Sequence, residues 1–448
     1  MKPYDFVIDY NFVNSFDINL LKKSLVLPIK KDGIYIECFC CKSSNTSFLE
    51  ADNIVKKVTL KKEEVEFFLN DTSLRQTLFN LSKKAIETNE LESNYIEEFF
   101  SNLIEKAIVS RVSDIHIESY DKNCVIRFRI DGSLKIFYIF EKSFLKVLSS
   151  HIKMVSKLEV TQNRVPMDGR FTFQIKEKKF DFRVSTMPTI NGESIVIRVL
   201  DSSNISKDIE DLGFSSHILD SIKDITKLKQ GLVLVTGPTG SGKSTTLYSL
   251  IKELNKEDRK IITVEDPVEY KLQQIQQIEV NDEINLGFNT VLKNILRQDP
   301  DVILIGEIRD FVSLSIALQA SLTGHLVLAS IHANNSIETI SRLVDLKADK
   351  FLLATTLKYI ISQRLVLNIC KDCNCKGCDK CNFSGYYGRS CIAEVLKIDD
   401  IIIKKVFNNE NLEDYLKKLN YKTIVDDAKQ KVENKVTTLR EVYKVIEI

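Results

Sequence analysis

Residues 230–250, QGLVLVTGPTGSGKSTTLYSL, are the most informative part of this chain. The apolar run LVLV is typical of a buried parallel strand, and the segment from KST onward has no glycine or proline to interrupt a helix. Between them, Gly237 and Gly242 are separated by four residues and followed by Lys243 and Ser244, the full phosphate-binding pattern. Such a loop points backbone N–H groups at phosphates, with the positive end of a helix behind them. The stretch therefore predicts a strand, a phosphate loop and a helix.

The glycine content supports this interpretation. Only 15 of the 448 residues are glycine, yet four of them fall at 231, 237, 240 and 242. A glycine-rich turn between two core elements is the alternative, but the flanking strand and helix favour a nucleotide site. We expect Lys243 to reach over the phosphates and the Ser244 hydroxyl to hold Mg²⁺. The predicted ATP-binding residues are Gly237, Pro238, Thr239, Gly240, Ser241, Gly242, Lys243, Ser244 and Thr245.

The composition is that of an ordinary globular protein with room for two to four domains. Hydrophobic residues make up 44%, charged residues 28%, and the net charge is +1, which excludes nucleic-acid binding through a whole basic face. The first ten residues, MKPYDFVIDY, lack a signal-peptide pattern, and no apolar run approaches the ~18 residues of a membrane span. We expect a cytosolic protein that reaches membranes only through partners. The ten cysteines indicate thiols or metal ligands rather than disulfides.

Two smaller parts precede the phosphate loop. Residues 1–80 predict a small mixed domain, in which Asp32-Gly33 marks a hairpin, and residues 81–94 a charged linker. Its expected elements are a helix at 18–24 and strands at 25–29 and 34–39. The C-x-C-C run at 38–41 has no matching second pair nearby, so core or surface thiols are favoured there over a metal site.

Residues 95–200 predict an α+β domain, with a helix at 99–109 followed by alternating strands. Arginines recur on these strands, and a solvated strand face is their ordinary explanation. Because the next domain binds a nucleotide triphosphate, these side chains are also candidates for stabilising charge at the phosphates. The sequence alone does not select among them. They are Arg127, Arg129, Arg170, Arg183 and Arg198.

Residues 201–448 alternate strand-like and helical runs, which predicts a parallel sheet flanked by helices. Two acids, Glu265 and Glu307, end strand-like runs, where parallel strands place residues beside the phosphates. One of them could orient or deprotonate water, although Glu307 could also simply pair with Arg309. His325 and His332 flank a further run, and their spacing alone favours structural roles.

Four motifs in order resemble the secretion ATPase superfamily, specifically the type II secretion and type IV pilus assembly ATPases. They are GPTGSGKST (237–245), TVEDPVEY (263–270), LRQDPDVILIGEIRD (296–310) and TGHLVLASIHAN (323–334), which match that family's Walker A, Asp box, Walker B and His box. Similarity extends upstream through SDIHIE, RFRIDG, DGR and RVSTMPTINGESIVIRVL, and downstream through SQRL and TTLREVYKVI. It covers roughly residues 95–448.

The resemblance implies a RecA-like ATPase domain at 201–448, preceded by a PAS-like α+β domain and an N-terminal docking domain. It implies a homo-hexamer, peripheral on the cytoplasmic face of the bacterial inner membrane, that works with a membrane platform protein and a cytoplasmic docking protein and binds no nucleic acid directly. It also implies catalytic roles for Glu265 and Glu307, leaving open which is the base. Arg170, Arg183 and Arg198 would act across the nucleotide, and His325 and His332 would sense the γ-phosphate or couple it to domain motion.

Two cysteine pairs, Cys370-x-x-Cys373 and Cys378-x-x-Cys381, have zinc-knuckle spacing, and four thiolates would close a tetrahedral structural site. Assembly ATPases carry such a tetracysteine element, although only four residues separate the pairs here, where the relatives have a longer excursion. Cys375 lies between the pairs and could compete as a ligand. We expect one Zn²⁺ in preference to reduced thiols, with Cys391 outside the site.

Two other classes of protein would share some of these sequence motifs. A regulatory subunit that binds nucleotide without turnover needs the phosphate loop but not the water-activating acids, so Glu265 and Glu307 favour a motor. A conjugation-type ATPase that moves DNA or effectors would share the ATPase core, but the cysteine pairs and the RFRIDG and DGR stretches disfavour it. The sequence does not identify the machine that such a motor would serve.

Overall fold

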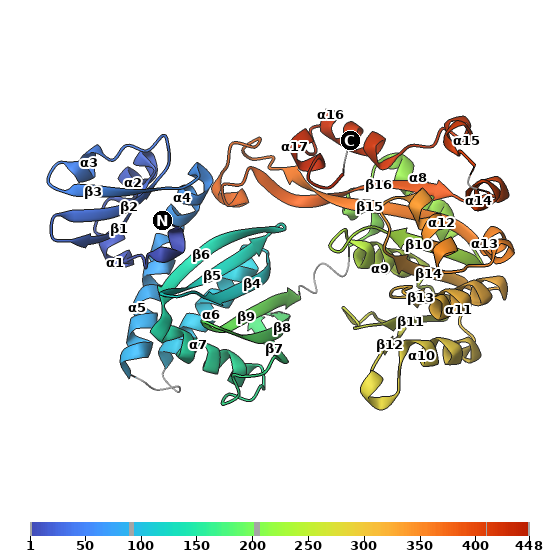
Figure 1. Cartoon of the computed structure of the whole chain (residues 1–448), viewed down its shortest axis with the longest axis horizontal. Coiled ribbons are helices and arrows are strands. Elements are labelled where there is room, and N and C mark those ends of the chain that lie inside the picture. Colours follow the sequence, from blue (N-terminus) through green and yellow to red (C-terminus); the bar gives the residue numbers. More distant parts are fainter. Residues whose placement is uncertain (1, 89–93, 201–206, 409, 447–448) are drawn as a thin grey trace. The chain divides into compact units, whose positions relative to one another are not determined.

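The computed structural model describes residues 2–88, 94–200, 207–408 and 410–446 (Figure 1). The chain forms two compact units. Unit 1 comprises Met1–Asp201 with Cys370–Tyr387, and unit 2 comprises Ser202–Ile369 with Gly388–Ile448. The boundaries of the three predicted domains stay a prediction. Segment 370–387, named the cysteine lobe below, belongs to unit 1 although it is inserted between two strands of unit 2.

Unit 1 begins with a three-stranded sheet in which β2 pairs antiparallel with β1 and parallel with β3. The expected hairpin is present, with Asp32 opposite Tyr35 across the turn. The strands are β1 (Val26–Asp32), β2 (Tyr35–Cys40) and β3 (Ile54–Thr59), and the helices are α1 (Tyr10–Val13), α2 (Ile18–Ser24), α3 (Ser47–Glu50), α4 (Lys62–Leu69) and α5 (Thr72–Thr88). The helix predicted at 18–24 is therefore confirmed.

A six-stranded antiparallel sheet, in the order β6-β5-β4-β9-β8-β7, forms the rest of unit 1. Its apolar side chains share one core with α5, α6, α7 and the N-terminal residues. Buried and more exposed residues alternate in the middle of β7 and β8, whereas β6 buries the four consecutive residues 137–140. The elements are α6 (Asn94–Val109), β4 (Val112–Ser119), β5 (Asn123–Ile130), β6 (Ser133–Glu141), α7 (Lys142–Val155), β7 (Met167–Ile175), β8 (Lys178–Thr189) and β9 (Gly192–Leu200).

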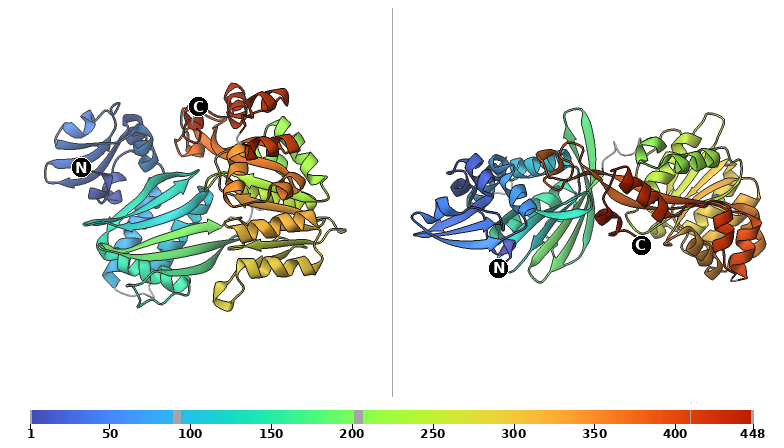
Figure 2. Two further views of the ribbon diagram at one scale, coloured as in Figure 1. Left: turned by 45° about the vertical axis from the view of Figure 1, so that its right-hand side comes forward. Right: turned by 90° about the horizontal axis from the view of Figure 1, so that it is seen from above.

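Unit 2 is built on a seven-stranded sheet in the order β12-β11-β13-β14-β10-β15-β16. Neighbours from β12 to β15 run parallel. The strands are β10 (Gly231–Thr236), β11 (Ile261–Glu265), β12 (Gln276–Glu279), β13 (Val302–Ile305), β14 (Leu326–Ile331), β15 (Leu357–Ile369) and β16 (Tyr386–Lys397). Helices cover both faces (Figure 2). On β10, Leu232 and Leu234 enter one core while Val233 and Val235 enter the other, as a doubly covered strand requires.

The helices of unit 2 form the two outer layers. α8 (Ser216–Thr226) and α9 (Lys243–Leu254) share one core. The other core contains residues of α10 (Phe288–Ile295), α11 (Phe311–Leu322), α12 (Ser336–Asp345), α13 (Lys350–Thr356), α14 (Asp400–Phe407) and α15 (Glu413–Lys418). α16 (Ile424–Glu433) and α17 (Leu439–Val442) pack on β15 and β16. Parallel strands with helices on both faces bring the ends of β10, β11, β13 and β14 to one edge of the sheet.

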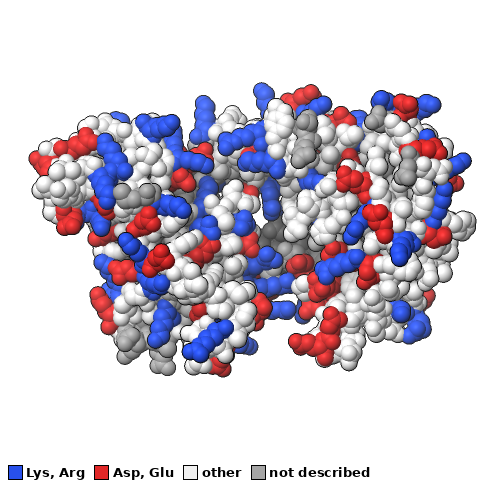
Figure 3. All heavy atoms as spheres, viewed as in Figure 1, with Lys and Arg blue, Asp and Glu red and all other residues white. Residues whose placement is uncertain are grey.

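The distribution of surface charge and the hydropathy of the helices agree with the amino-acid composition. Lysine and arginine side chains are interspersed with aspartate and glutamate over the face seen in Figure 3, as the net charge of +1 leads one to expect. Within the part of the chain that the structure describes, no helix is long and apolar enough to cross a membrane.

Candidate functional site

The phosphate loop joins the end of β10 to the start of α9. Gly237 has a φ of +147°, and a Cβ there would lie 2.5 Å from the carbonyl oxygen of Gln363, so only glycine fits. The N-cap of α9 is Gly242, which offers no side-chain oxygen to the first turn of the helix. The N–H groups of that turn are thus left for an anionic ligand.

Lys243 folds back over this loop. Its Nζ donates to the carbonyl oxygens of Gly237, at 2.9 Å, and Pro238, at 3.3 Å. Burial lowers the pKa of Lys243, while the nearby Glu307 carboxylate opposes that shift. An ammonium group held by neutral carbonyls in a partly buried loop would gain strongly from phosphate oxygens.

A cavity of about 940 Å³ opens beside the loop, at the upper end of the usual range for ligand sites. Residues 239–245 line it, whereas Gly237 and Pro238 contribute their carbonyls to Lys243 instead. Residues at and just after the carboxyl ends of β11, β13 and β14 form the charged wall of the cavity. Its ionisable members are Glu265, Asp266, Glu269, Glu307, Arg309, Asp310 and His332.

Glu307 follows β13 and is held from two sides. Its Oε2 accepts a hydrogen bond from Arg309 Nε at 2.9 Å, and its Oε1 lies 3.1 Å from His332 Nε2. The expected pairing with Arg309 is therefore present, but it is joined by a histidine from the end of the neighbouring strand. The Glu307 side chain remains 24% exposed, so one face of the carboxylate can meet solvent or ligand.

Glu265, at the end of β11, has a different environment. It is only 5% exposed, and its carboxylate accepts hydrogen bonds from Tyr248 Oη and, at 2.6 Å, from Thr263 Oγ1. Gln277 Nε2 adds a third, longer contact of 3.4 Å. These donors satisfy the carboxylate within the protein.

The two histidines occupy opposite ends of β14. His332 follows the carboxyl end of the strand and lines the cavity, whereas His325 precedes the amino end. His325 Nδ1 lies 2.9 Å from the carbonyl oxygen of Ala320 and 3.2 Å from Thr323 Oγ1, so it closes the turn after α11. A six-residue strand separates the two by about 20 Å. The structure thus brings His332, but not His325, to the nucleotide cavity.

Sequence patterns missed several cavity residues. Arg389 and the segment 287–290 at the start of α10 also line it. No local motif marks them, because a single arginine after the cysteine lobe or a short polar turn has no distinctive spacing.

The four predicted cysteine ligands converge within the cysteine lobe. The Sγ atoms of Cys370, Cys373, Cys378 and Cys381 all lie within 4.8 Å of one another. Three of the six sulfur pairs are 3.7 to 3.8 Å apart, close to the ~3.8 Å expected for thiolates at about 2.3 Å from a tetrahedral zinc. The shortened spacing between the pairs is therefore compatible with one site. Cys375 is exposed and Cys391 is buried elsewhere.

The cysteine lobe packs on the strands of unit 1. Lys135 Nζ on β6 donates to the carbonyl oxygen of Asn382 at 2.6 Å. The guanidinium of Arg111 lies 3.7 Å from the centre of the Tyr387 ring, a cation–π contact. All ten cysteines lie in the described residues, where each is a free thiol.

Comparison with known proteins identifies the family. The model for "Type II/IV secretion system protein" matches residues 89–444. The chain belongs to this family. The predicted resemblance is therefore confirmed, and with it the expectation that the chain is a secretion-type ATPase.

Relatives in the type II/IV secretion system family cover most of the chain. Type II secretion system protein E of Dickeya dadantii (strain 3937) is 38% identical over 421 residues, 88% of this chain and 84% of the relative. Type II secretion system ATPase E of Vibrio cholerae serotype O1 is 39% identical over 370 residues, 77% of this chain and 74% of the relative.

Solved structures of similar proteins support the fold. The pilus retraction motor PilT with bound ADP is 28% identical, with a TM-score of 0.58, and the match covers 78% of this chain and 97% of that one. The Legionella pneumophila ATPase DotB, at 24% identity and a TM-score of 0.63, shares the fold over 78% of this chain and 95% of its own. The predicted α/β class with a RecA-like domain is confirmed.

In this member of the type II/IV secretion system family, the three candidate arginines form a row across unit 1. Arg170 pairs with Arg183, and Arg183 with Arg198, on the neighbouring strands β7, β8 and β9. Arg198 continues the row to Asp114 on β4, with its Nε 3.1 Å from Asp114 Oδ1. One carboxylate thus faces the end of a row of three guanidinium groups.

Proposed function

We propose that this chain hydrolyses ATP as a hexamer, and that hydrolysis powers assembly of a pilus or pseudopilus for type II secretion, type IV pili or DNA uptake. One observation carries the proposal: a single cavity of unit 2 combines the phosphate loop with Glu307 and His332. A protein that only binds nucleotide needs the loop but no acid placed to activate water. The likeness to the ADP-bound motor PilT supports the same conclusion.

The loop residues would bind the nucleotide. Backbone N–H groups of 239–245 would contact the β- and γ-phosphates, and Lys243 would exchange its two carbonyl partners for phosphate oxygens. Ser244 would hold Mg²⁺, which neutralises charge on the phosphates when bound. The residues present fit this role, because the Ser244 hydroxyl and the acids of the cavity wall offer the oxygen ligands that Mg²⁺ prefers.

Glu307 is our candidate for the acid that orients and deprotonates water. A general base must reach the water from which it takes a proton. The partly exposed Glu307 meets that condition, whereas the carboxylate of Glu265 is buried and occupied by three internal donors. In this account Glu265 orders the wall of the cavity, and His332 holds Glu307 and couples it to the loop that follows β14.

The arginine row of unit 1 would stabilise charge on the transferring phosphoryl group. Like charges directly opposite each other on neighbouring strands destabilise a sheet. Arg170, Arg183 and Arg198 lie opposite one another on neighbouring strands, so they could approach the phosphates of one triphosphate together. His325, at the far end of β14, has no part in this site.

The cysteine lobe would hold one structural Zn²⁺ through Cys370, Cys373, Cys378 and Cys381. Four closely spaced thiolates fit a closed tetrahedral site, which stabilises the fold and performs no chemistry.

The proposal extends to the setting of the motor. We place the hexamer in the cytoplasm, peripheral on the inner membrane through a platform protein, with a docking protein contacting the N-terminal part of unit 1. The related type II secretion proteins support this setting.

A comparison of two variants tests the assignment of the acids. Glu307→Gln keeps the size of the side chain, so MgATP should still bind while steady-state turnover falls by about 10²- to 10⁴-fold. Glu265→Gln should instead lower the melting temperature, with a smaller loss of turnover in the folded protein. Normal turnover in Glu307→Gln, or loss of turnover confined to Glu265→Gln, would reject the assignment.

A further inference from the structure

A buried glutamine of the SQRL stretch, to which no role was assigned above, contacts the phosphate loop. Gln363 lies on β15 and is 0% exposed. Its Oε1 accepts a hydrogen bond from Thr246 Oγ1 at 2.8 Å, and its Nε2 donates to the carbonyl oxygen of Ser241 at 2.8 Å. One partner belongs to the loop and the other to the first turn of α9. Gln363 itself is not among the described residues that line the cavity.

The sheet register explains this position. β15 runs beside β10, with Thr236 opposite Ser362, so Gln363 stands where the chain leaves the sheet to form the loop. The side chain of Gln363 packs tightly against the phosphate loop. A Cβ at Gly242 would lie 3.2 Å from Gln363 Nε2. The loop and this amide are therefore packed against each other without spare room.

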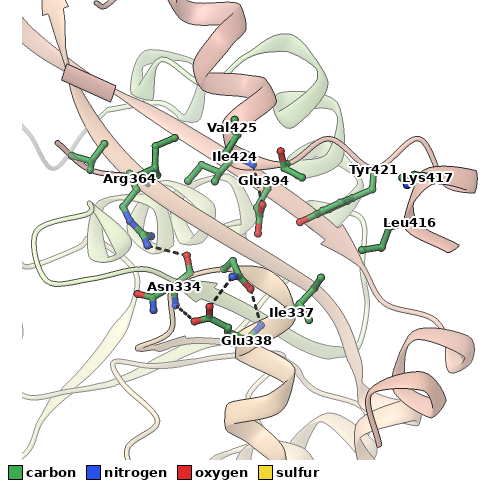
Figure 4. Close-up of a pocket in the computed structure, with 14 residues that line it drawn as sticks. Asn334, Ile337, Glu338, Arg364, Glu394, Leu416, Lys417, Tyr421, Ile424 and Val425 are labelled. Carbon is green, nitrogen blue, oxygen red and sulfur yellow. Dashed lines mark hydrogen bonds between the residues drawn. The ribbon is translucent and has the colours of Figure 1, made fainter. Parts of the chain in front are cut away.

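The neighbours of Gln363 contact the second loop of the cavity. Arg364 Nη2 donates to the carbonyl oxygen of Asn334 at 2.9 Å (Figure 4). Ser362 Oγ donates to the same oxygen at 3.3 Å. Asn334 follows His332 by two residues. Hydrogen bonds from residues 362–364 of β15 thus connect both the phosphate loop and the loop after β14 to this strand.

We infer that Gln363 is a positioning residue for ATP binding and hydrolysis, because it fixes the carbonyl of Ser241 and the hydroxyl of Thr246 and so holds the N–H groups of the loop in place. The inference rests on the nucleotide site proposed above. The inferred role requires the side-chain amide. The Ser241 carbonyl can only accept a hydrogen bond, while the Thr246 hydroxyl donates one and needs an acceptor. A carboxamide offers one donor and one acceptor from the same group; a carboxylate offers only acceptors, and a protonated carboxyl again offers both.

This chemistry supplies a test through Gln363→Glu. Burial raises the pKa of a carboxyl group at this position, so acidification converts the side chain to the neutral form, whose O–H can donate to Ser241. At pH 8, we expect the dissociation constant of Gln363→Glu for the Mg²⁺ complex of adenylyl imidodiphosphate to be about tenfold or more above that of the wild type. The ratio of the two dissociation constants should fall toward one by pH 5.5. Gln363→Leu, which can neither donate nor accept, should show the same loss at both pH values.

Thr437→Val is the matched control. The Thr437 hydroxyl donates to the carbonyl of Leu367 on the same strand at 2.7 Å, away from the loop. Its loss should lower the melting temperature without changing nucleotide affinity, which separates a positioning role from general destabilisation of β15.

The outcomes are distinct. Recovery of Gln363→Glu at low pH, with Gln363→Leu flat and Thr437→Val normal, supports the inference. Wild-type affinity in folded Gln363→Leu, or a Gln363→Glu ratio that does not change with pH, overturns it. Because the ratio of Gln363→Glu to the wild type is compared between two pH values, the test stands even if Gln363→Leu fails to fold. A wild-type protein that binds no nucleotide would instead contradict the proposed function.

Discussion

Removal of metal from the cysteine lobe should change thiol reactivity by a number that follows from the structure. Of ten cysteines, five are buried elsewhere (Cys38, Cys40, Cys41, Cys124 and Cys391), four form the cluster, and Cys375 is exposed. With zinc bound, about one thiol per chain should react quickly with a chromogenic aromatic disulfide. After chelation, four more become accessible, giving about five.

The physical reason is that the cluster lies outside the apolar cores, so metal would be the main interaction among its four thiols. Structural zinc contributes about 10–16 kcal/mol in small zinc-binding peptides, whereas the four cluster cysteines belong to none of the apolar cores. The lobe should therefore open without metal, while both units keep their cores. Nucleotide affinity should stay unchanged, because the phosphate loop belongs to unit 2.

The assay counts fast-reacting thiols before and after chelation and quantifies released zinc in the same sample. Cys375→Ser is the control and should lower both counts by one. Five fast thiols before chelation, or a count that does not rise when zinc is removed, would contradict a zinc ion bound by these four cysteines.

Three further predictions concern individual side chains. Lys243→Ala should abolish MgATP binding while the melting temperature stays within a few degrees; global unfolding would contradict a purely functional role. Arg183→Ala should slow turnover at least tenfold with little change in MgATP affinity, whereas Lys179→Ala on the same strand should do neither; equal effects would argue against the arginine row. Asp310 caps α11 by accepting from Ser313 N–H at 2.8 Å, so Asp310→Ala should cost about 1 kcal/mol in the free energy of unfolding. The same backbone hydrogen bond lowers the pKa of Asp310, so this contribution is present above the usual aspartate pKa of ~4 and is lost as pH falls further; a difference between variant and wild type that persists at pH 2 would contradict it.

The parts of the site that could be predicted from the sequence are those formed by short contiguous segments. The phosphate loop is contiguous, and Glu265, Glu307 and His332 each follow a short apolar run that forms a parallel strand. Parallel strands bring such ends to one edge, so the pattern predicted Glu265 and Glu307 beside the phosphates, whereas a role for His332 there was implied only by the family resemblance. The two cysteine pairs were equally local.

The remaining features depend on contacts between distant parts of the chain. Gln363 contacts Ser241 and Thr246, which lie 122 and 117 residues away in the sequence, and the SQRL stretch around it does not indicate that contact. His325 and His332 belong to one motif, yet a strand separates them, because the sequence spacing does not show which end of the strand reaches the cavity. The cysteine lobe lies within the ATPase half of the sequence but packs on unit 1 through Lys135, which only the three-dimensional structure shows.

Steady-state ATP turnover of the purified full chain is the decisive test of the proposed hexameric motor when the oligomer mass is measured in the same sample with and without nucleotide. We expect a hexamer whose turnover requires Mg²⁺ and disappears in Glu307→Gln, while that variant still binds nucleotide. A monomer that binds MgATP without turning it over, even in the presence of its membrane partner, would contradict the claim and favour a regulatory nucleotide-binding subunit.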